Sequence, residues 1–306
     1  MFFLFADDTN LLFSHENLKE LIKIINAELG KVSDWIIANK LSLNFSKSKF
    51  IIFHPYQRAD FIPLLIRIFI QGHAIEHVRE LSFLGVTIDE NLSWKNHIDI
   101  TAKKLSRAVG VLKHLKNFVP KNILRLIYNG LILPYINYGI LCWGSCNPTT
   151  LSRITILQKR AIRIITGARY YSHHEPLCRA NKLLNLSDIY KSRICKLIHS
   201  WFRNDLPPRI MKLFSKVSDC HDVNTRNANS NKFSIPKFRL SLRSQSPTLS
   251  IARIWNILEN DLSPHLNLTL NSFAYRCRNY FINRYSQNCP LQNTNLFCFS
   301  CNPPQI

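Results

Sequence analysis

Up to residue 89, apolar residues occur in short runs separated by polar turns, with one longer segment of helical spacing. That segment, residues 17–39, repeats apolar side chains every three or four positions and predicts an amphipathic helix. Residues 41–53 alternate apolar and polar positions, which predicts one long strand or a pair of strands. Residues 61–71 and 74–89 predict another hairpin. The first part of the chain is therefore expected to combine strands with a helix.

Beyond Ser93, the apolar spacing is helical almost everywhere. Ser93 is expected to cap a helix that Pro120 ends, and Gly167 to stop another helix, as glycine commonly does. The spacing predicts helices between residues 93 and 120 and over residues 121–133, 150–166, 187–202, 249–259 and 272–285. Together with the first part, this pattern predicts an α+β fold with a mostly helical body.

The composition changes again after residue 215. Residues 216–250 are rich in Asn and Ser, which predicts a linker or a loosely ordered segment. Residues 286–306 show no clear pattern of apolar positions. We therefore expect the last part of the chain to be partly disordered.

Two adjacent carboxylates, Asp7 and Asp8, lie between the apolar runs 1–5 and 9–13. This order predicts a β-hairpin with both acids at its turn. Neighbouring carboxylates repel each other, and Mg²⁺, which prefers carboxylates together with substrate phosphates, relieves that repulsion. The simpler interpretation is an ordinary turn, because Asp is common in turns, where it bonds its own backbone.

Several blocks of sequence follow the segment Phe5-Ala6-Asp7-Asp8 along the chain. They are 29–39 (LGKVSDWIIAN), 40–53, 81–89 (LSFLGVTID), 133–144 (LPYINYGILCWG), 157–167 (LQKRAIRIITG), 224–226 and 254–256. In this order the blocks resemble reverse transcriptases of non-LTR (LINE-type) retrotransposons, most of all the jockey and CR1 groups, and Phe5-Ala6-Asp7-Asp8 is similar to palm motif C of that family. Blocks in the right order are far more specific than any one motif.

The resemblance implies roles for particular residues. Asp7, the first Asp of motif C, and its neighbour Asp8 would bind catalytic Mg²⁺. Lys47, in the motif D segment, would lie near the leaving pyrophosphate and protonate it, with Lys49 as the competing candidate. The motif E block grips the primer end in that family, and there Gly85 would let the backbone approach the primer. The residues of this block that we expect at the primer are Phe83, Leu84 and Gly85.

The resemblance also implies an architecture: a partial polymerase palm, with the strands of motifs C to E and a helix, then a mostly helical thumb and a C-terminal extension. We expect the partial palm with motifs C and D at 1–60, the motif E or primer-grip hairpin at 61–90, the thumb at 91–215 and the extension at 216–306. Fingers and motifs A and B precede motif C in that family. Because two-metal catalysis needs carboxylates from two strands, we expect this chain to be inactive without an upstream palm and fingers portion of the same polyprotein.

The chain is strongly basic, with 40 Lys and Arg residues against 19 Asp and Glu and a net charge of +21. Such a charge favours a polyanionic partner, and the resemblance implies an RNA template and a DNA primer. Basic residues cluster on two predicted helices, whose apolar faces leave the opposite faces free to meet phosphates. The predicted contacts are Lys103, Lys104 and Arg107 on the first helix, and Arg153, Lys159, Arg160 and Arg163 on the second.

Cysteine use and hydropathy indicate the compartment. No run reaches the roughly 18 uninterrupted apolar residues of a membrane span. Cysteines without a secretory signal favour free thiols, so we expect an intracellular protein, in the nucleus or in a cytoplasmic ribonucleoprotein. Cys289, Cys298 and Cys301 are weak zinc candidates, because the CxxC pair has no matched second pair.

Two other interpretations stay open. The chain could be a nucleic-acid-binding remnant of a truncated element, which keeps the basic helices but does no chemistry. More distantly, it could be an unrelated Mg²⁺-dependent phosphotransferase that uses the Asp pair. A second acidic strand upstream of Met1 would distinguish the polymerase from the remnant.

Overall fold

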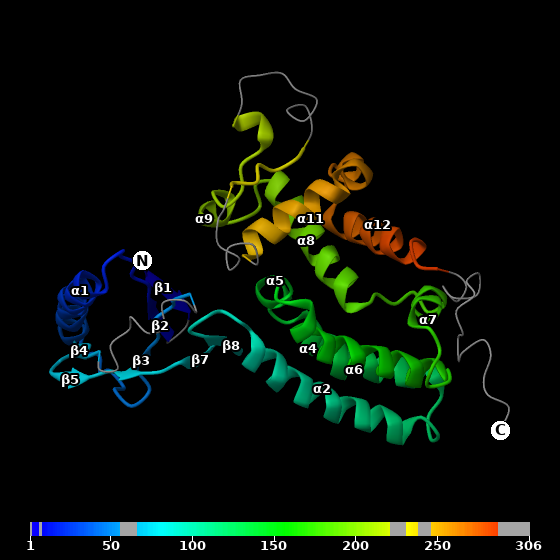
Figure 1. Ribbon diagram of the computed structural model, residues 1–306, viewed down its shortest axis with the longest axis horizontal. Helices are drawn as coiled ribbons and strands as arrows, with labels where there is room; N and C mark the ends of the chain where they lie inside the picture. The colour runs from blue at the N-terminus through cyan, green and yellow to red at the C-terminus, as the bar shows by residue number, and fades with distance from the viewer. Residues whose placement is uncertain (1, 6–7, 56–65, 221–230, 238–245, 287–306) are drawn as a thin grey trace. The chain divides into compact units, whose positions relative to one another are not determined.

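Every β-strand that the structure describes lies in the first of the two units into which the chain folds. The computed structural model describes residues 2–5, 8–55, 66–220, 231–237 and 246–286 (Figure 1). The first unit is Met1–Ser93 and the second is Trp94–Ile306. Each unit has an apolar core of its own. The mixture of helix and sheet agrees with the predicted α+β class at this coarse level.

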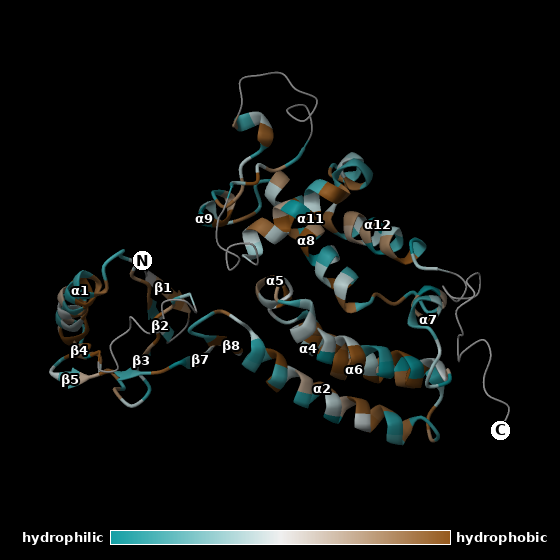
Figure 2. Cartoon of the chain, viewed as in Figure 1, coloured by the Kyte–Doolittle hydropathy of each residue, from teal (hydrophilic) through white to brown (hydrophobic). Residues whose placement is uncertain are grey.

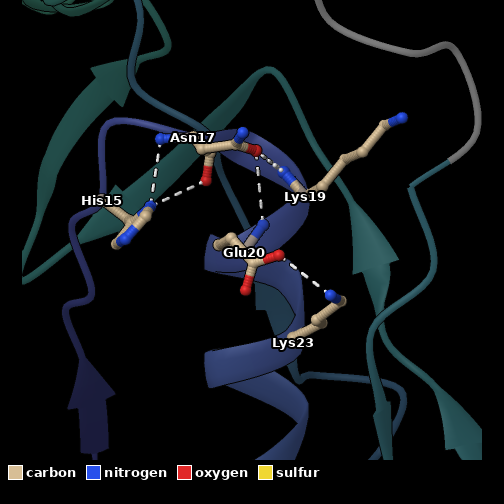
Figure 3. A network of polar contacts seen from close by, with 5 residues as sticks. All are labelled: His15, Asn17, Lys19, Glu20 and Lys23. Carbon is tan, nitrogen blue, oxygen red and sulfur yellow. Dashed lines mark hydrogen bonds and ion pairs between the residues drawn. The ribbon is translucent and has the colours of Figure 1, made fainter.

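The amphipathic helix predicted in the first part is confirmed as α1, Leu18–Ala38. Its start is fixed by Asn17, whose Oδ1 accepts hydrogen bonds from the backbone N–H groups of Lys19 at 2.9 Å and Glu20 at 3.4 Å (Figure 3). The backbone N–H of Asn17 in turn donates to Nδ1 of His15 at 3.0 Å. Asn17 therefore satisfies N–H groups that the first turn of a helix leaves without partners.

One face of α1 helps to build the core of the first unit. The side chain of Asn26, in the middle of α1, accepts a hydrogen bond from the backbone N–H of Phe69 at 3.0 Å. This bond joins α1 to the strand β4, Phe69–Ile70. The buried apolar residues of this core are Leu29, Ile66, Ile68 and Ile70.

The strands of the first unit form two-stranded sheets. The antiparallel hairpins are β1 (Phe2–Phe5) with β2 (Asp8–Leu11), β4 with β5 (His73–Ala74), and β7 (Glu80–Phe83) with β8 (Val86–Asp89). The strand β3 (Lys49–Phe50) pairs in parallel with β6 (Glu76–His77). The hairpin predicted around the Asp pair is therefore confirmed in its strands. The hairpin predicted from 61–71 and 74–89 is present in its described part as β4 with β5, and β7 with β8 is a further hairpin within 74–89. Of the predicted 61–71 segment, residues 61–65 lie outside the described residues.

The strand or strand pair predicted for residues 41–53 is wrong over most of that segment. Oδ1 of Asn44 accepts hydrogen bonds from Oγ of Ser46 at 2.7 Å and from the backbone N–H of Lys47 at 3.2 Å. The backbone carbonyl of Asn44 accepts from Oγ of Ser48 at 2.9 Å. These local bonds form a turn, and they compete with the strand that the apolar spacing indicates.

The prediction that Ser93 caps the next helix is wrong. The helix α2, Lys95–Leu115, follows Trp94, which has a left-handed backbone and makes no side-chain cap. Ser93 instead binds Asp89 at the end of β8: its backbone N–H donates to Oδ1 at 2.9 Å and its Oγ to Oδ2 at 3.2 Å. These two bonds hold Ser93 at the end of β8, and Trp94 occupies the position directly before the helix.

Helices make up the regular structure of the second unit, and the predicted ones are confirmed with shifted boundaries. A π-helical turn interrupts the predicted 121–133 helix. After α2 the elements are α3 (Lys121–Ile127), η2 (Tyr128–Ile132), α4 (Leu133–Asn137), α5 (Ile140–Trp143), α6 (Pro148–Thr166), α7 (His174–Ala180), α8 (Leu186–Phe202), α9 (Pro208–Met211), η3 (Val217–Asp219), α11 (Pro247–Leu262), η4 (Ser263–His265) and α12 (Leu270–Asn283).

The prediction of a loosely ordered linker over 216–250 is wrong for the described residues 231–237. Phe233 is only 1% exposed, and its ring centroid lies 4.9 Å from that of Trp201 and 5.4 Å from that of Phe214. Asn256 on α11 holds its backbone, because the amide Nδ2 donates to the carbonyl and Oδ1 accepts from the N–H, both at 2.8 Å. One aromatic side chain with a paired backbone therefore fixes a polar segment. Residues 221–230, 238–245 and 287–306 lie outside the described residues.

Candidate nucleic-acid interface

The helices α2 and α6 pack side by side and run in the same direction (Figure 1). An ion pair between Arg153 of α6 and Asp99 of α2 joins the N-terminal halves of the two helices. At the other end, Gly167 closes α6 with a φ of 72°, and a Cβ built on it would lie 3.3 Å from Cε of Lys121, at the start of α3. We call these two adjacent helices the α2–α6 platform.

The helix α2 has a basic outer face. Leu105, Val109 and Leu112 are buried, whereas Lys103 and Arg107 are exposed. Teal and brown segments alternate along α2 in Figure 2, as expected for a helix with one apolar face. Lys103 and Arg107 are four residues apart and so lie on the same face. Neither forms an ion pair with any residue that the structure describes.

Lys104, also exposed, has a partner on α4. Its Nζ lies 5.7 Å from the ring centroid of Tyr135, a cation–π distance. The ring of Tyr135 is itself 40% exposed. Because an exposed cation–π contact is weak, the ammonium of Lys104 stays available to an anion while the ring directs it.

On α6, the predicted cationic residues divide into two kinds. Arg153 is paired with Asp99, and Arg163 donates from Nε to the backbone carbonyl of Ser172 at 2.9 Å. Burial lowers the pKa of Arg163. Arg160 is exposed and forms no ion pair within the described ranges. The structural contacts therefore leave Arg160 as the α6 residue best placed to bind a phosphate.

Lys159 lies at the side of α6 that meets α7. Burial, and after it the positive charge of Lys159, lowers the pKa of His174 in the first turn of α7. Lys159 is half-buried. The ammonium of Lys159 is therefore partly shielded from solvent and acts on His174. Lys159 is a weaker candidate than the exposed Arg160 for binding a phosphate.

Two tyrosines that follow α6 were not assigned a role from the sequence. Tyr170 and Tyr171 are 68% and 64% exposed, and their ring centroids lie 5.0 Å apart in an edge-to-face arrangement. They directly follow the exposed Arg169. Exposed aromatic rings beside cations are the elements on which unpaired bases stack. The run Arg169-Tyr170-Tyr171 after a helix-ending glycine was the signal in the sequence.

The hairpin β7–β8 carries the predicted motif E residues at its tip. Phe83 pairs with Val86, and the two residues between them, Leu84 and Gly85, have φ angles of 46° and 76°. Left-handed backbone at both central positions is the geometry of a tight hairpin turn. The turn by itself therefore accounts for Gly85, and the approach of a primer is not needed to explain it.

The predicted catalytic residues lie on and near short strands of the first unit. Asp7 lies outside the described residues, while Asp8 begins β2 opposite Phe5 and is exposed. Nζ of Lys49 pairs with Glu76 at 3.1 Å. Lys47 is exposed in the Asn44 turn and forms no ion pair with the residues described.

A magnesium pair requires more carboxylates than the described part of this hairpin supplies. Two-metal catalysis uses carboxylates from two strands. Of the motif C pair, only Asp8 belongs to the described residues. Over the described ranges, no group of three or more His, Cys, Asp or Glu side chains could hold a metal ion. The described residues therefore do not by themselves fit a Mg²⁺ pair. The predicted zinc candidates Cys289, Cys298 and Cys301 lie outside the described residues.

No helix that the structure describes has the length and the apolar character to cross a bilayer.

In sequence, the chain is similar to RNA-directed DNA polymerases of Drosophila mobile elements. It is 26% identical over 170 residues to a probable RNA-directed DNA polymerase from transposon BS of Drosophila melanogaster. The aligned region covers 55% of this chain and 18% of the relative. It is 25% identical over 202 residues to the RNA-directed DNA polymerase from mobile element jockey of the same species, over 62% of this chain and 21% of the relative. The predicted resemblance to reverse transcriptases of non-LTR elements is therefore confirmed.

The similarity covers only part of these relatives. The chain spans about one fifth of the length of the curated relatives it matches. No family model matches the chain, and no solved structure matches it. The palm, primer-grip and thumb assignments therefore stay predictions.

Proposed function

We propose that the chain is part of a non-LTR retrotransposon reverse transcriptase, and that the α2–α6 platform holds the phosphate backbone of the template–primer duplex. One observation carries this proposal. Lys103, Arg107 and Arg160 are exposed and form no ion pairs with described residues, on two helices that pack side by side. Cations in such an array neutralise phosphates without reading the bases.

The neighbouring residues support a backbone-binding role. Tyr135 directs the ammonium of Lys104, and Tyr170 and Tyr171 provide exposed rings beside Arg169 for an unpaired base. A duplex of RNA with DNA is recognised mostly through its shape and phosphates. The platform is therefore proposed to bind template and primer of any sequence.

Nucleotidyl transfer is proposed to occur in the larger protein. There Asp7 and Asp8, together with carboxylates from an upstream strand, would hold Mg²⁺, Lys47 would donate a proton to the leaving pyrophosphate, and the β7–β8 tip would meet the primer end. When bound, Mg²⁺ supplies charge neutralisation at the reacting phosphate. The apolar strand β1 supports a further partner, because Leu4 is 73% and Phe5 62% exposed. We propose that an upstream palm and fingers portion covers this surface.

The test is binding of a fluorescein-labelled RNA–DNA duplex, followed by anisotropy at several salt concentrations. The variant Lys103→Gln/Arg107→Gln/Arg160→Gln should bind at least about tenfold more weakly, and the slope of log affinity against log salt should fall by about 2 to 3. The control is Lys212→Gln/Lys237→Gln/Arg276→Gln, which removes the same charge at exposed positions outside the platform. An equal loss in both variants would show that net charge, and not the platform, binds the duplex.

A further inference from the structure

A cavity of about 330 Å³ opens among α3, η2, α4, α8 and α12 of the second unit. Its cationic lining side chains are Arg125 from α3, Arg193 and Lys196 from α8, and Arg278 from α12. Asn129, Asn137 and Ser192 add amide and hydroxyl groups. The cavity is thus lined by cations and neutral polar groups that converge from separate helices.

No carboxylate lines this cavity among the residues described. A second cavity, of about 410 Å³, differs in this respect, because Glu175 and Asp188 line it together with Lys191 and Arg284. In that second cavity, Lys191 also pairs with Asp188 at 3.1 Å. Its charges therefore balance internally, while those of the first cavity do not.

Hydrogen bonds to uncharged groups orient two of the four cations. Nε of Arg193 donates to Oδ1 of Asn137 at 3.3 Å, and Nη2 of Arg278 donates to the backbone carbonyl of Lys182 at 2.6 Å. Each guanidinium has five N–H donors, so most of them stay available. The neutral partners hold the side chains in place without cancelling their charge.

Three of the four cations lie close enough to repel one another: Arg193, Lys196 and Arg278. Burial lowers the pKa of Lys196, and the charges of Arg193 and Arg278 lower it further. Like charges brought together destabilise the free protein, and a bound anion removes that cost. Guanidinium groups match the geometry of phosphate oxygens and bind them through paired N–H bonds.

We propose that this cavity is a binding site for a phosphate group, held by Arg125, Arg193, Lys196 and Arg278. The site is separate from the α2–α6 platform and does not depend on it. The phosphate comes either from a nucleic-acid backbone or from a free phosphate compound such as pyrophosphate. The chemistry of recognition is the same for both sources, and competition distinguishes them.

The test is a calorimetric titration of the full chain with inorganic pyrophosphate at low ionic strength. The double variant Arg193→Gln/Lys196→Gln should bind pyrophosphate at least about tenfold more weakly, because two charge-assisted contacts are lost. Lys212→Gln/Arg276→Gln removes the same charge outside the cavity and should bind as the wild type does. Circular dichroism and Tm establish that both variants fold.

A second arm uses a labelled single-stranded 12-nucleotide DNA. If pyrophosphate displaces this DNA from the wild type, and the double variant binds the DNA weakly, the site takes backbone phosphates. If pyrophosphate binds to the cavity without displacing the DNA, the site takes a free phosphate compound. The proposal is overturned if wild-type binding of pyrophosphate is not saturable, or if the control variant loses as much affinity as the double variant.

Discussion

Arg153 on α6 and Asp99 on α2 form an ion pair that joins the N-terminal halves of the two platform helices, and the side chains are 63% and 31% exposed. An exposed pair of this kind contributes about 0 to 1 kcal/mol to stability. Its larger effect is on the charge of the platform, because Asp99 neutralises Arg153, which the sequence analysis predicts to contact phosphate. The two residues together add no net charge to the platform.

The double variant Asp99→Asn/Arg153→Gln is therefore expected to bind an RNA–DNA duplex within about twofold of the wild type, because the net charge of the platform is unchanged. Arg160→Gln alone should weaken binding by roughly three- to tenfold, because Arg160 has no carboxylate partner among the described residues. Fluorescence anisotropy at one fixed salt concentration measures both. A double variant that binds as weakly as Arg160→Gln would show that Arg153 itself contacts phosphate.

Spacing alone predicted the helices well, because a buried apolar face is a periodic property of the sequence. Ile98, Leu105, Val109 and Leu112 are all at most 3% exposed on α2, where the period placed them. The secondary-structure predictions were wrong where hydrogen bonds of a polar side chain determined the local backbone in place of the apolar spacing. Asn44 replaced a strand with a turn, which no count of apolar positions could indicate.

The candidate site was predicted by charge, and charge does not reveal partners. Lys103 and Arg160 have the exposure that the prediction required, while Arg153 and Arg163 are engaged by Asp99 and by the carbonyl of Ser172. Asp99 lies 54 positions before Arg153 in the chain, so only the packing of α2 on α6 brings them together. Such long-range pairing is a property of the fold rather than of a local pattern.

Phe233 provides a test of how the apolar core of the second unit is packed. Phe233→Ala is expected to lower the free energy of unfolding by about 3 to 5 kcal/mol, because it removes a buried ring and leaves a cavity beside Trp201 and Phe214. Urea unfolding followed by tryptophan fluorescence measures the change. Ile235→Ala in the same segment is the control, since that side chain is 39% exposed, and its cost should stay below about 1 kcal/mol. Equal costs would mean that the segment does not dock through Phe233.

Buried thiols make the stability of the chain sensitive to alkali. Burial raises the pKa of Cys178 to about 12 and that of Cys146 to about 11, from an ordinary value of 9.0. A thiol whose pKa is higher in the folded than in the unfolded state contributes to the free energy of unfolding, and this contribution is present in full below pH 9. The contribution is lost as the pH rises from 9 toward 12, because the unfolded chain then releases protons that the folded chain retains.

We therefore expect the free energy of unfolding to fall between pH 9 and pH 10.5 in urea titrations under reducing conditions. In Cys178→Ala, whose small side chain cannot ionise, the fall should be shallower than in the wild type. Cys220, which is exposed, is the matched position, and Cys220→Ala should keep the wild-type slope. Equal slopes in all three proteins would contradict the assignment of the effect to the buried thiol.

The last prediction concerns catalysis. The purified chain should not extend an RNA-templated DNA primer with Mg²⁺ or Mn²⁺, because the motif C pair, Asp7 and Asp8, offers one edge of a site that needs carboxylates from two strands. Mg²⁺ also keeps most of its waters when few protein ligands are present. Adding a palm and fingers portion of a jockey-type polymerase in trans should produce extension that Asp7→Ala abolishes.

Three outcomes of that experiment separate the interpretations. Extension by the chain alone that Asp7→Ala abolishes would overturn the prediction and show a complete site, for example one shared by two copies. Extension in trans that survives Asp7→Ala would remove Asp7 from the catalytic site. Duplex binding without any extension in trans would favour a nucleic-acid-binding remnant, because the α2–α6 platform would then retain its function while the motif C hairpin had lost its own. Lys212→Gln, an exposed substitution outside the platform, should behave as the wild type in every arm and controls for handling of the variants.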